Sequence, residues 1–223
     1  MNLKRIKEVI LSLNPKTIYF NFKYFPFRVA IQLPVFVAFR TYLFKTGGEI
    51  HIHGPVHPGM IRIGYGEVGI FDNKKNRVIW ELQGQLHFHG TAIIKFGSKI
   101  SVGPDAELHI GDGFRISPKS AIVCLKKITF GSNVRISWET FVIDSDFHKI
   151  INLEGDVLNH PKEITIGNNV WIGMRATIMK GTCISDHVVI GAGSFINKKI
   201  DGSYQIIAGH PARVVKENVT WQA

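Results

Sequence analysis

The amino-acid sequence predicts an all-β solenoid, a parallel β-helix, and the first observation behind this prediction is a period of six residues. One residue type recurs at every sixth position within residues 164–199: Ile166, Ile172, Ile178, Ile184, Ile190 and Ile196. Glycine often follows it, and the position two residues before it is apolar or small. An α-helix would give a period near 3.6 and an alternating strand one near 2, so neither explains this repeat.

Six residues make one flat side of a triangular coil, and three sides make a turn of about 18 residues. The isoleucine column then lies inside, and small residues occupy the corners where the chain bends. Residues 164–199 supply two such coils, residues 86–143 supply about three, and residues 50–63 start another. An extruded loop over 144–163 interrupts the repeat, and the period is also lost over 65–83.

The overall composition agrees with one soluble domain. The chain has 223 residues, a net charge of +10 and 45% hydrophobic residues, which excludes a disordered chain. Cys124 and Cys183 are the only cysteines, too few for a disulfide scaffold and without the spacing of a zinc site. A reducing, cytoplasmic compartment is therefore expected. The opening residues do not fit a signal peptide, and no apolar stretch is long enough to span a bilayer.

Residues 1–48 differ from the rest of the chain in charge and aromatic content. They hold eight Lys or Arg and one acid, a balance of +7, and ten of the 24 aromatic residues. We expect a partly helical segment over 1–48, opening with an amphipathic helix in the first dozen residues, then a solenoid over 49–203 and a tail over 204–223. Such a segment suits either peripheral attachment to the inner face of the plasma membrane or a cap on the open end of the solenoid. Nucleic acid is not an expected partner.

Four segments carry a resemblance to a known family. They are GSNVRISWETFVIDSDFH at 131–148, ITIGNNVWIG at 164–173, VVIGAGS at 188–194 and AGHPARVV at 208–215. Together they resemble the hexapeptide-repeat acyltransferases, especially the maltose, galactoside and capsular-sugar O-acetyltransferases. The resemblance implies a left-handed β-helix, a homotrimer, and acetyl-CoA bound between neighbouring prisms. It also implies acetyl transfer to a hydroxyl of a sugar or glycan in the biosynthesis of capsule or surface polysaccharide.

Transfer to a hydroxyl requires a base with a pKa near neutral, and histidine meets this requirement most readily. His148 lies at the start of the extruded loop and, by the resemblance, matches the catalytic base. Asp144 or Asp146 could orient its ring, or could serve only the turn in which both lie. His160 and His187 are expected to be surface residues.

The remaining candidate residues concern the donor and the acceptor. By the resemblance, the cofactor positions are Met174, Ala192, Gly193, Asn197, Lys198, Arg213 and Lys216. The exposed backbone of Ala192 and Gly193 would lie beside the pantetheine arm of coenzyme A. The positive charges of Lys198, Arg213 and Lys216 suit its phosphates. Ser117 stands where the family has a substrate-side Asn, and Met174 where it often has Ser. Trp138 and Trp171 are expected either to line the substrate cleft or to pack at corners.

Two other function classes fit parts of the sequence. A zinc enzyme of the γ-carbonic anhydrase type would need His148, His160 and His187 as ligands across a subunit boundary. A structural or lipid-binding solenoid would need none of these side chains. The spacing and the tail motif favour the acyltransferase, for which we expect no metal. The pairs His51/His53 and His87/His89, two coils apart, could bind a metal but are expected to be solvent-facing strand positions.

Overall fold

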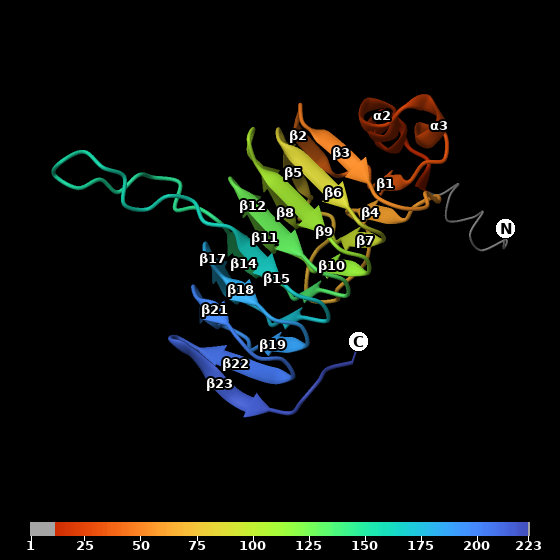
Figure 1. The fold of residues 1–223 in the computed structure, drawn as a ribbon. Coiled ribbons are helices and arrows are strands. Elements are labelled where there is room, and N and C mark those ends of the chain that lie inside the picture. The colour runs from red at the N-terminus through yellow and green to blue at the C-terminus, as the bar shows by residue number, and fades with distance from the viewer. Residues whose placement is uncertain (1–11, 223) are drawn as a thin grey trace.

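A computed structural model describes residues 12–222 of the protein, so the amphipathic helix expected in the first dozen residues lies almost entirely outside the described part. The described strands coil into a triangular prism, with two short helices at its N-terminal end and a hairpin at its C-terminal end (Figure 1). No helix among residues 12–222 is long and apolar enough to cross a bilayer.

Three sheets form the sides of the prism, and the chain visits them in the same order in every coil. Sheet A contains β1 (Val35–Val37), β4 (Ile61–Ile63), β7 (Ala92–Ile94), β10 (Phe114–Ile116), β13 (Arg135–Ile136), β16 (Trp171–Ile172), β19 (Val188–Ile190), β22 (Gln205–Gly209) and β23 (Ala212–Glu217). Sheet B contains β2 (Tyr42–Thr46), β5 (Ile79–Leu82), β8 (Lys99–Val102), β11 (Ala121–Cys124), β14 (Phe141–Ile143), β17 (Thr177–Met179) and β20 (Phe195–Ile196). Sheet C contains β3 (Glu49–Ile52), β6 (Gln85–Phe88), β9 (Glu107–Ile110), β12 (Lys127–Phe130), β15 (Ile164–Ile166), β18 (Cys183–Ile184) and β21 (Lys199–Ile200).

The isoleucine period predicted the core correctly. Ile166 pairs in parallel register with Phe130 above and Ile184 below, and all three side chains are buried. Every sixth residue therefore points inward and stacks on its equivalent one coil away, which removes a continuous apolar column from water. The expected loop over 144–163 is present between β14 and β15. The interruption expected over 65–83 is shorter, because residues 64–78 join β4 to β5 and the solenoid resumes at β5.

The coil begins earlier than the sequence indicated. Strand β1 pairs in parallel with β4, and β2 pairs with β5, so residues 35–46 belong to the solenoid rather than to a separate segment. At the other end, β22 extends sheet A and pairs antiparallel with β23. These strands interrupt the six-residue period, with a bulge between Leu43 and Lys45 and another between Ile206 and Ile207, so the repeat alone could not reveal them.

Helices α2 (Pro15–Tyr24) and α3 (Phe27–Ala30) cover the N-terminal end of the prism. Asn14 caps α2 by accepting hydrogen bonds from the backbone of Lys16 and Thr17. On the inner face, Asn21 accepts from the Val35 N–H and donates to the Val35 carbonyl oxygen, so its amide takes the place of a neighbouring strand. The described part of the N-terminal segment is thus a cap that closes the edge strand β1.

Candidate active site

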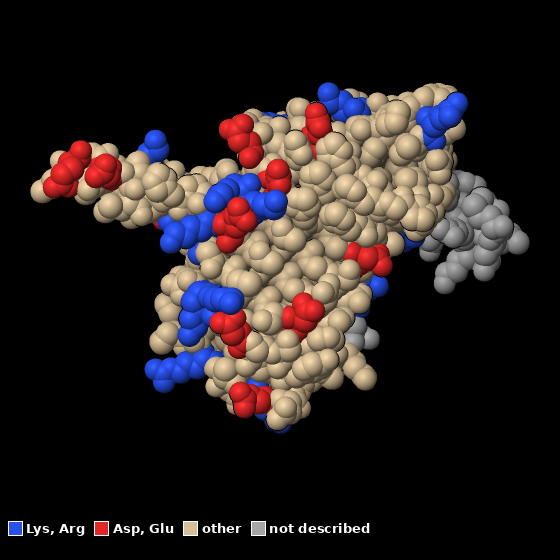
Figure 2. All heavy atoms as spheres, in the orientation of Figure 1, with Lys and Arg blue, Asp and Glu red and all other residues tan. Residues whose placement is uncertain are grey.

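The candidate residues lie on two different edges of the prism. The turns from sheet A to sheet B stack into one edge, which we call edge AB, and the turns from sheet B to sheet C form edge BC. Residues 144–163 leave edge BC as a long hairpin, closed by an antiparallel bridge between Ile151 and Val157. Acidic side chains gather at its tip, which contains Glu154 and Asp156 (Figure 2).

Asp144 is a structural residue at the base of the hairpin. Its buried carboxylate accepts hydrogen bonds from the backbone N–H groups of Leu125 and Lys126, at 2.7 and 2.8 Å, one coil away along edge BC. Burial and the neighbouring Asp144 raise the pKa of the Cys124 thiol well above its usual range. Cys124 is consequently protonated near neutral pH and is not a nucleophile.

Asp146 forms hydrogen bonds within the base of the hairpin and not with the ring of His148. Its carboxylate accepts from Lys180 Nζ and from Asn159 Nδ2, and these two contacts hold the pKa of Asp146 below its usual value. The Asn159 amide also donates to the backbone carbonyl oxygen of His148, at 2.8 Å. Neither Asp144 nor Asp146 is hydrogen-bonded to the imidazole of His148, so of the two expected roles these contacts favour the structural one over orientation of the ring.

The His148 side chain is exposed at the base of the hairpin. Its backbone is held from both sides, because its N–H donates to the Asp146 carbonyl oxygen at 2.7 Å and its own carbonyl oxygen accepts from Asn159. Within residues 12–222 no hydrogen bond engages the ring. The ring nitrogens are therefore available to a bound substrate. Sequence reasoning missed Asn159 and Lys180, because neither belongs to a motif that the repeat exposes.

Edge AB holds five of the ten expected donor and acceptor residues. Ser117, Trp138, Met174, Ala192 and Gly193 follow one another along it, in successive turns. Gly193 has a φ of +68°, and no heavy atom lies within 4 Å of the place a Cβ would occupy, so its backbone is open to a ligand. Trp138 is half-buried against the Phe71 ring, with centroids 6.4 Å apart.

The other candidates lie elsewhere. Asn197 and Lys198 are exposed on edge BC, the edge that carries His148, and Arg213 and Lys216 are exposed on β23. Trp171 lies on the outer face of sheet A, where Nε1 donates to Ser137 Oγ at 2.9 Å and the ring packs near Trp221. One protomer therefore does not bring His148 together with Ser117, Met174 and Gly193, because sheet B separates the two edges.

Within one protomer, the three histidines of the zinc alternative do not lie together. His187 stacks on Tyr204 in a turn between sheets C and A, whereas His148 and His160 belong to the hairpin on edge BC. Among residues 12–222, no three histidine, cysteine or acidic side chains are arranged to hold a metal ion.

Five other histidines form a ladder on the outer face of sheet C. The rings of His51, His87 and His109 stack in one column, and those of His53 and His89 stack beside them. The sequence revealed four of these histidines, as the pairs His51/His53 and His87/His89, but the expected separation of two coils was wrong. His51 pairs directly with His87 one coil away, because the loop at 64–78 lengthens that coil. The sequence analysis missed His109, whose register with His87 follows from the β6–β9 pairing. Desolvation and the neighbouring histidines lower the pKa of His87 to about 4.

Comparisons with known proteins identify the family. Residues 163–198 match the family described as "Bacterial transferase hexapeptide (six repeats)". The chain is 30% identical over 146 residues to a putative acetyltransferase of Saccharomyces cerevisiae, a match that covers 66% of this chain and 72% of the relative. This protein belongs to the hexapeptide-repeat transferases, as its motifs suggested.

Other relatives match over shorter stretches. Galactoside O-acetyltransferase of Escherichia coli is 38% identical over 50% of this chain and 55% of its own length. A polysialic acid O-acetyltransferase of Neisseria meningitidis is 40% identical over 43% of this chain and 45% of its own length. The chain thus spans about half the length of these two relatives.

Solved structures confirm the fold. The polySia-specific acetyltransferase NeuO has a TM-score of 0.51 and 26% identity, over 80% of this chain and 70% of that one. The polysialic acid O-acetyltransferase OatWY has a TM-score of 0.57 at 24% identity, over 78% and 91% of the two chains. The solenoid is a left-handed parallel β-helix, as expected from the resemblance.

Proposed function

We propose that this protein transfers an acetyl group from acetyl-CoA to a hydroxyl of a sugar or glycan, in the biosynthesis of capsule or surface polysaccharide. The observation that carries the proposal is His148, an exposed imidazole on the hairpin of a hexapeptide-repeat β-helix, with its backbone fixed by Asn159. Relatives named for O-acetyl transfer to galactosides and polysialic acid support the reaction and the glycan acceptor.

Acetyl-CoA supplies an acetyl group activated as a thioester. The surface of the protein suits it, because the backbone at Gly193 is open and the cations Lys198, Arg213 and Lys216 have no carboxylate within 4 Å among residues 12–222. The ring of His148 takes the proton of the acceptor hydroxyl as its oxygen attacks the thioester carbonyl carbon. The C–S bond then breaks, and the imidazolium of His148 returns the proton to the departing thiolate.

The split between the edges supports a homotrimer with shared sites. If edge AB of one protomer faces edge BC of the next, His148 of one copy meets Gly193 and Ser117 of another. The hairpin tip supports this arrangement, because the side chains of Ile151 and Leu153 are exposed with nothing covering them in the described protomer.

Substitution of the proposed base tests the reaction. His148→Ala should lower turnover by about 10²- to 10⁴-fold while acetyl-CoA binding, measured by calorimetry, persists. His160→Ala, in the same hairpin, is the matched control and should stay near wild type. A fully active His148→Ala enzyme would contradict the assignment.

Mixed oligomers test the shared site. His148→Ala and Gly193→Trp should each be inactive as pure assemblies, yet trimers containing both should regain activity, since some clefts then combine two intact edges. Light scattering should give three times 25.0 kDa. An active monomer, or mixed assemblies as inactive as the pure ones, would contradict the arrangement.

We also propose that the N-terminal cap attaches the protein to an anionic membrane surface on the cytoplasmic side. The outer face of α2 and α3 exposes Phe22 and Phe27, 48% and 69% accessible, beside Lys23 and Arg28. No acidic residue occurs between residues 9 and 48. Exposed rings and cations on one face suit the interface of an anionic bilayer.

Vesicle sedimentation tests this attachment. The protein should bind vesicles rich in phosphatidylserine at low salt, and the double variant Phe22→Ser/Phe27→Ser should lose this binding. Phe147→Ser removes an equally exposed ring, 63% accessible, from the hairpin and should bind as wild type does. Wild-type protein that ignores such vesicles would contradict the proposal.

A further inference from the structure

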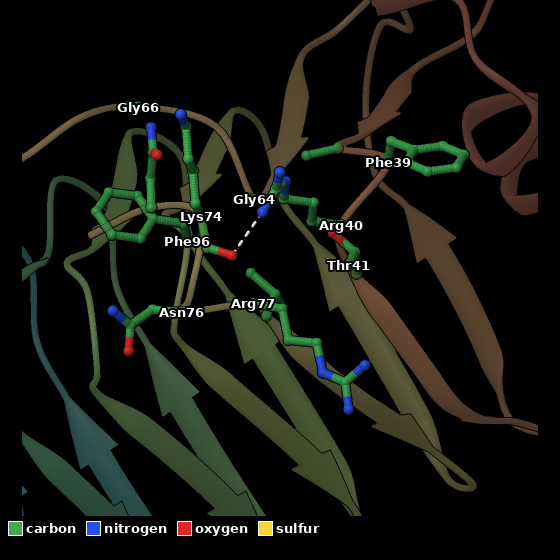
Figure 3. Close-up of a pocket in the computed structure, with 12 residues that line it drawn as sticks. Phe39, Arg40, Thr41, Gly64, Gly66, Lys74, Asn76, Arg77 and Phe96 are labelled. Carbon is green, nitrogen blue, oxygen red and sulfur yellow. Dashed lines mark hydrogen bonds between the residues drawn. The ribbon is translucent and has the colours of Figure 1, made fainter. Parts of the chain in front are cut away.

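A pocket of about 390 Å³ opens on edge AB near the N-terminal end of the prism. Its walls come from the turn at 38–41, from the loop at 64–78 and from Phe96 (Figure 3). The other turns of edge AB contain about four residues, whereas the loop at 64–78 is a long excursion, so the pocket exists only because this loop stands away from the coil.

Specific contacts hold the loop in place along the edge. The Arg40 guanidinium donates a hydrogen bond to the Lys74 carbonyl oxygen at 2.5 Å. Further along, Phe71 packs edge-on against Trp138, and Lys119 Nζ lies 4.8 Å from the centre of the Phe71 ring. The loop therefore runs beside the turns that contain Ser117 and Trp138, and the pocket adjoins the acceptor side of the proposed site.

The pocket is basic. Arg40 and Lys74 both line it, with the Arg40 guanidinium directed at the Lys74 backbone beside Gly64 (Figure 3), and no acidic side chain lines it. Two acids, Glu67 and Asp72, line the adjoining hollow instead. Asp72 is engaged in its own turn, where its carboxylate accepts from the Lys74 N–H at 2.7 Å.

One further feature suits a sugar. Thr41 is buried at the pocket, and its hydroxyl has no hydrogen-bond partner, which is costly unless a ligand supplies one. Phe39 also borders the pocket, but its exposed ring points away from Arg40 and Lys74, and Lys16 Nζ lies 5.4 Å from the ring centre. Guanidinium and ammonium groups beside Thr41 would bind a carboxylate or phosphate on the same sugar.

We propose that this pocket binds an anionic sugar residue, so that the acceptor of the reaction is an acidic glycan. This inference rests on the proposed acetyl transfer. Arg40 and Lys74 neutralise the carboxylate or phosphate, Thr41 bonds to a sugar hydroxyl or ring oxygen, and the glycan continues along edge AB past Ser117. A neutral acceptor would leave the two cations without a counter-charge and gain nothing from them.

The matched control comes from the same pocket. Arg77 borders it, but its guanidinium extends away from Arg40 and Lys74 and lies 4.5 Å from the centre of the Tyr42 ring. Arg77→Gln therefore removes one positive charge from the same surface without removing a contact to the proposed ligand.

Direct binding is the first measurement, because it does not depend on acetyl transfer. Three oligosaccharides of similar length are titrated by calorimetry: oligosialic acid for the carboxylate, a phosphodiester-linked glycan for the phosphate, and maltoheptaose as the neutral probe. We expect one of the acidic probes to bind and maltoheptaose to bind much more weakly. Arg40→Gln and Lys74→Gln should each weaken the acidic probe about ten- to a hundredfold, and Arg77→Gln should not.

Acetyl transfer from labelled acetyl-CoA is the second measurement. The acidic probe should have the lower KM, and Arg40→Gln should reduce its advantage over the neutral probe. Equal binding of acidic and neutral probes, or an unchanged affinity in both variants, would overturn the inference even if transfer occurs. Binding of an acidic probe without transfer to any acceptor would instead overturn the proposed reaction and leave the pocket as an anionic-sugar site.

Discussion

The side-chain amide of Asn159 donates a hydrogen bond to the backbone carbonyl oxygen of His148, at 2.8 Å, across the base of the extruded hairpin. The same amide also donates to Asp146, and its oxygen accepts from the Ile150 N–H. Lys180, on the next turn of edge BC, donates to Asp146 and to the Asn159 carbonyl oxygen. The position of His148 is therefore set by a polar clamp rather than by a carboxylate on its ring.

Loss of the clamp should slow the reaction without removing the donor site. Asn159→Ala breaks three hydrogen bonds around His148, and displacement of a catalytic group by about 1 Å can cost on the order of 10²-fold in rate. We expect kcat to fall by roughly ten- to a hundredfold, with acetyl-CoA affinity retained. Steady-state kinetics beside calorimetry would measure this.

Asn152→Ala is the control for the clamp. Asn152 bonds to Asp156 near the hairpin tip by both its amide nitrogen and its oxygen, and neither bond involves His148, Asn159 or Asp146. This variant should keep near-normal turnover. If the two variants lose the same activity, Asn159 acts only through the general stability of the hairpin.

Replacement of Asp144 should destabilise the fold rather than impair catalysis directly. Its two carboxylate oxygens serve the N–H groups of Leu125 and Lys126, and Asp144→Asn keeps only one acceptor oxygen for them. One buried N–H left unpaired costs about 1–3 kcal/mol, and each kcal/mol lowers Tm by about 2–4 °C in a domain of this size. Thermal unfolding should show this loss, whereas Asp105→Asn, at an exposed turn, should leave Tm unchanged.

The fold was largely predictable because one column of side chains repeats strictly. Ile166, Ile178 and Ile190 must each point inward, so the period fixes which residues form strands and which form turns. The N-terminal end of the solenoid was less predictable, because the outer edge of β1 is hydrogen-bonded by helix α2 and not by another coil. There the side chains of Asn21 and Thr17 make the hydrogen bonds that a neighbouring strand would otherwise make with β1. The sequence alone does not show that a polar residue in a helix pairs with a strand edge.

The site was predictable only in part, for a different reason. His148 was identified because it combines a motif with an interruption of the repeat. The clamp joins Asp146 directly to Lys180, 34 positions away, and Asn159 bonds to both, but no spacing rule links these residues. The division of the candidates between two edges likewise depends on how many residues each turn contains, which the motifs do not specify.

The contacts of Asn21 yield a prediction for the cap. Asn21→Ala would leave the buried N–H and carbonyl groups of Val35 without partners, at a cost of about 1–3 kcal/mol each. We expect a fall in Tm of several degrees and faster hydrogen exchange at β1. Asn73→Ala, in the exposed loop at 64–78, should change neither quantity. Unaltered exchange at Val35 would show that the cap does not close this strand.

The histidine ladder should make the fold sensitive to acid. His87 lies between His51 and His109 in its column and bonds to His53 in the second column, which also contains His89. Glu49, Glu107 and Lys127 are the charged groups beside the ladder. Because the pKa of His87 is lowered to about 4 from 6.5, the unfolded chain takes up a proton more readily than the folded protein. The contribution of unprotonated His87 to the free energy of unfolding is therefore fully present above about pH 6.5 and is lost as the pH falls towards 4.

His87→Thr is the informative variant, because Thr129 and Thr165 continue the same column in the coils beyond His109. The ring is partly exposed, so screening reduces its effect to about 1–2 kcal/mol, or about 2–8 °C in Tm. Wild-type Tm should fall between pH 7 and pH 5 by more than that of His87→Thr. The exposed His160→Thr should follow wild type, since its ring belongs to no stack.

Glu107 titrates in the same direction at lower pH. Its pKa is lowered chiefly by Lys127, so it adds a loss of stability as the pH falls further, which is why the comparison is made above pH 5. An identical fall in wild type and His87→Thr would mean that the stacked rings accept protons without cost to the fold.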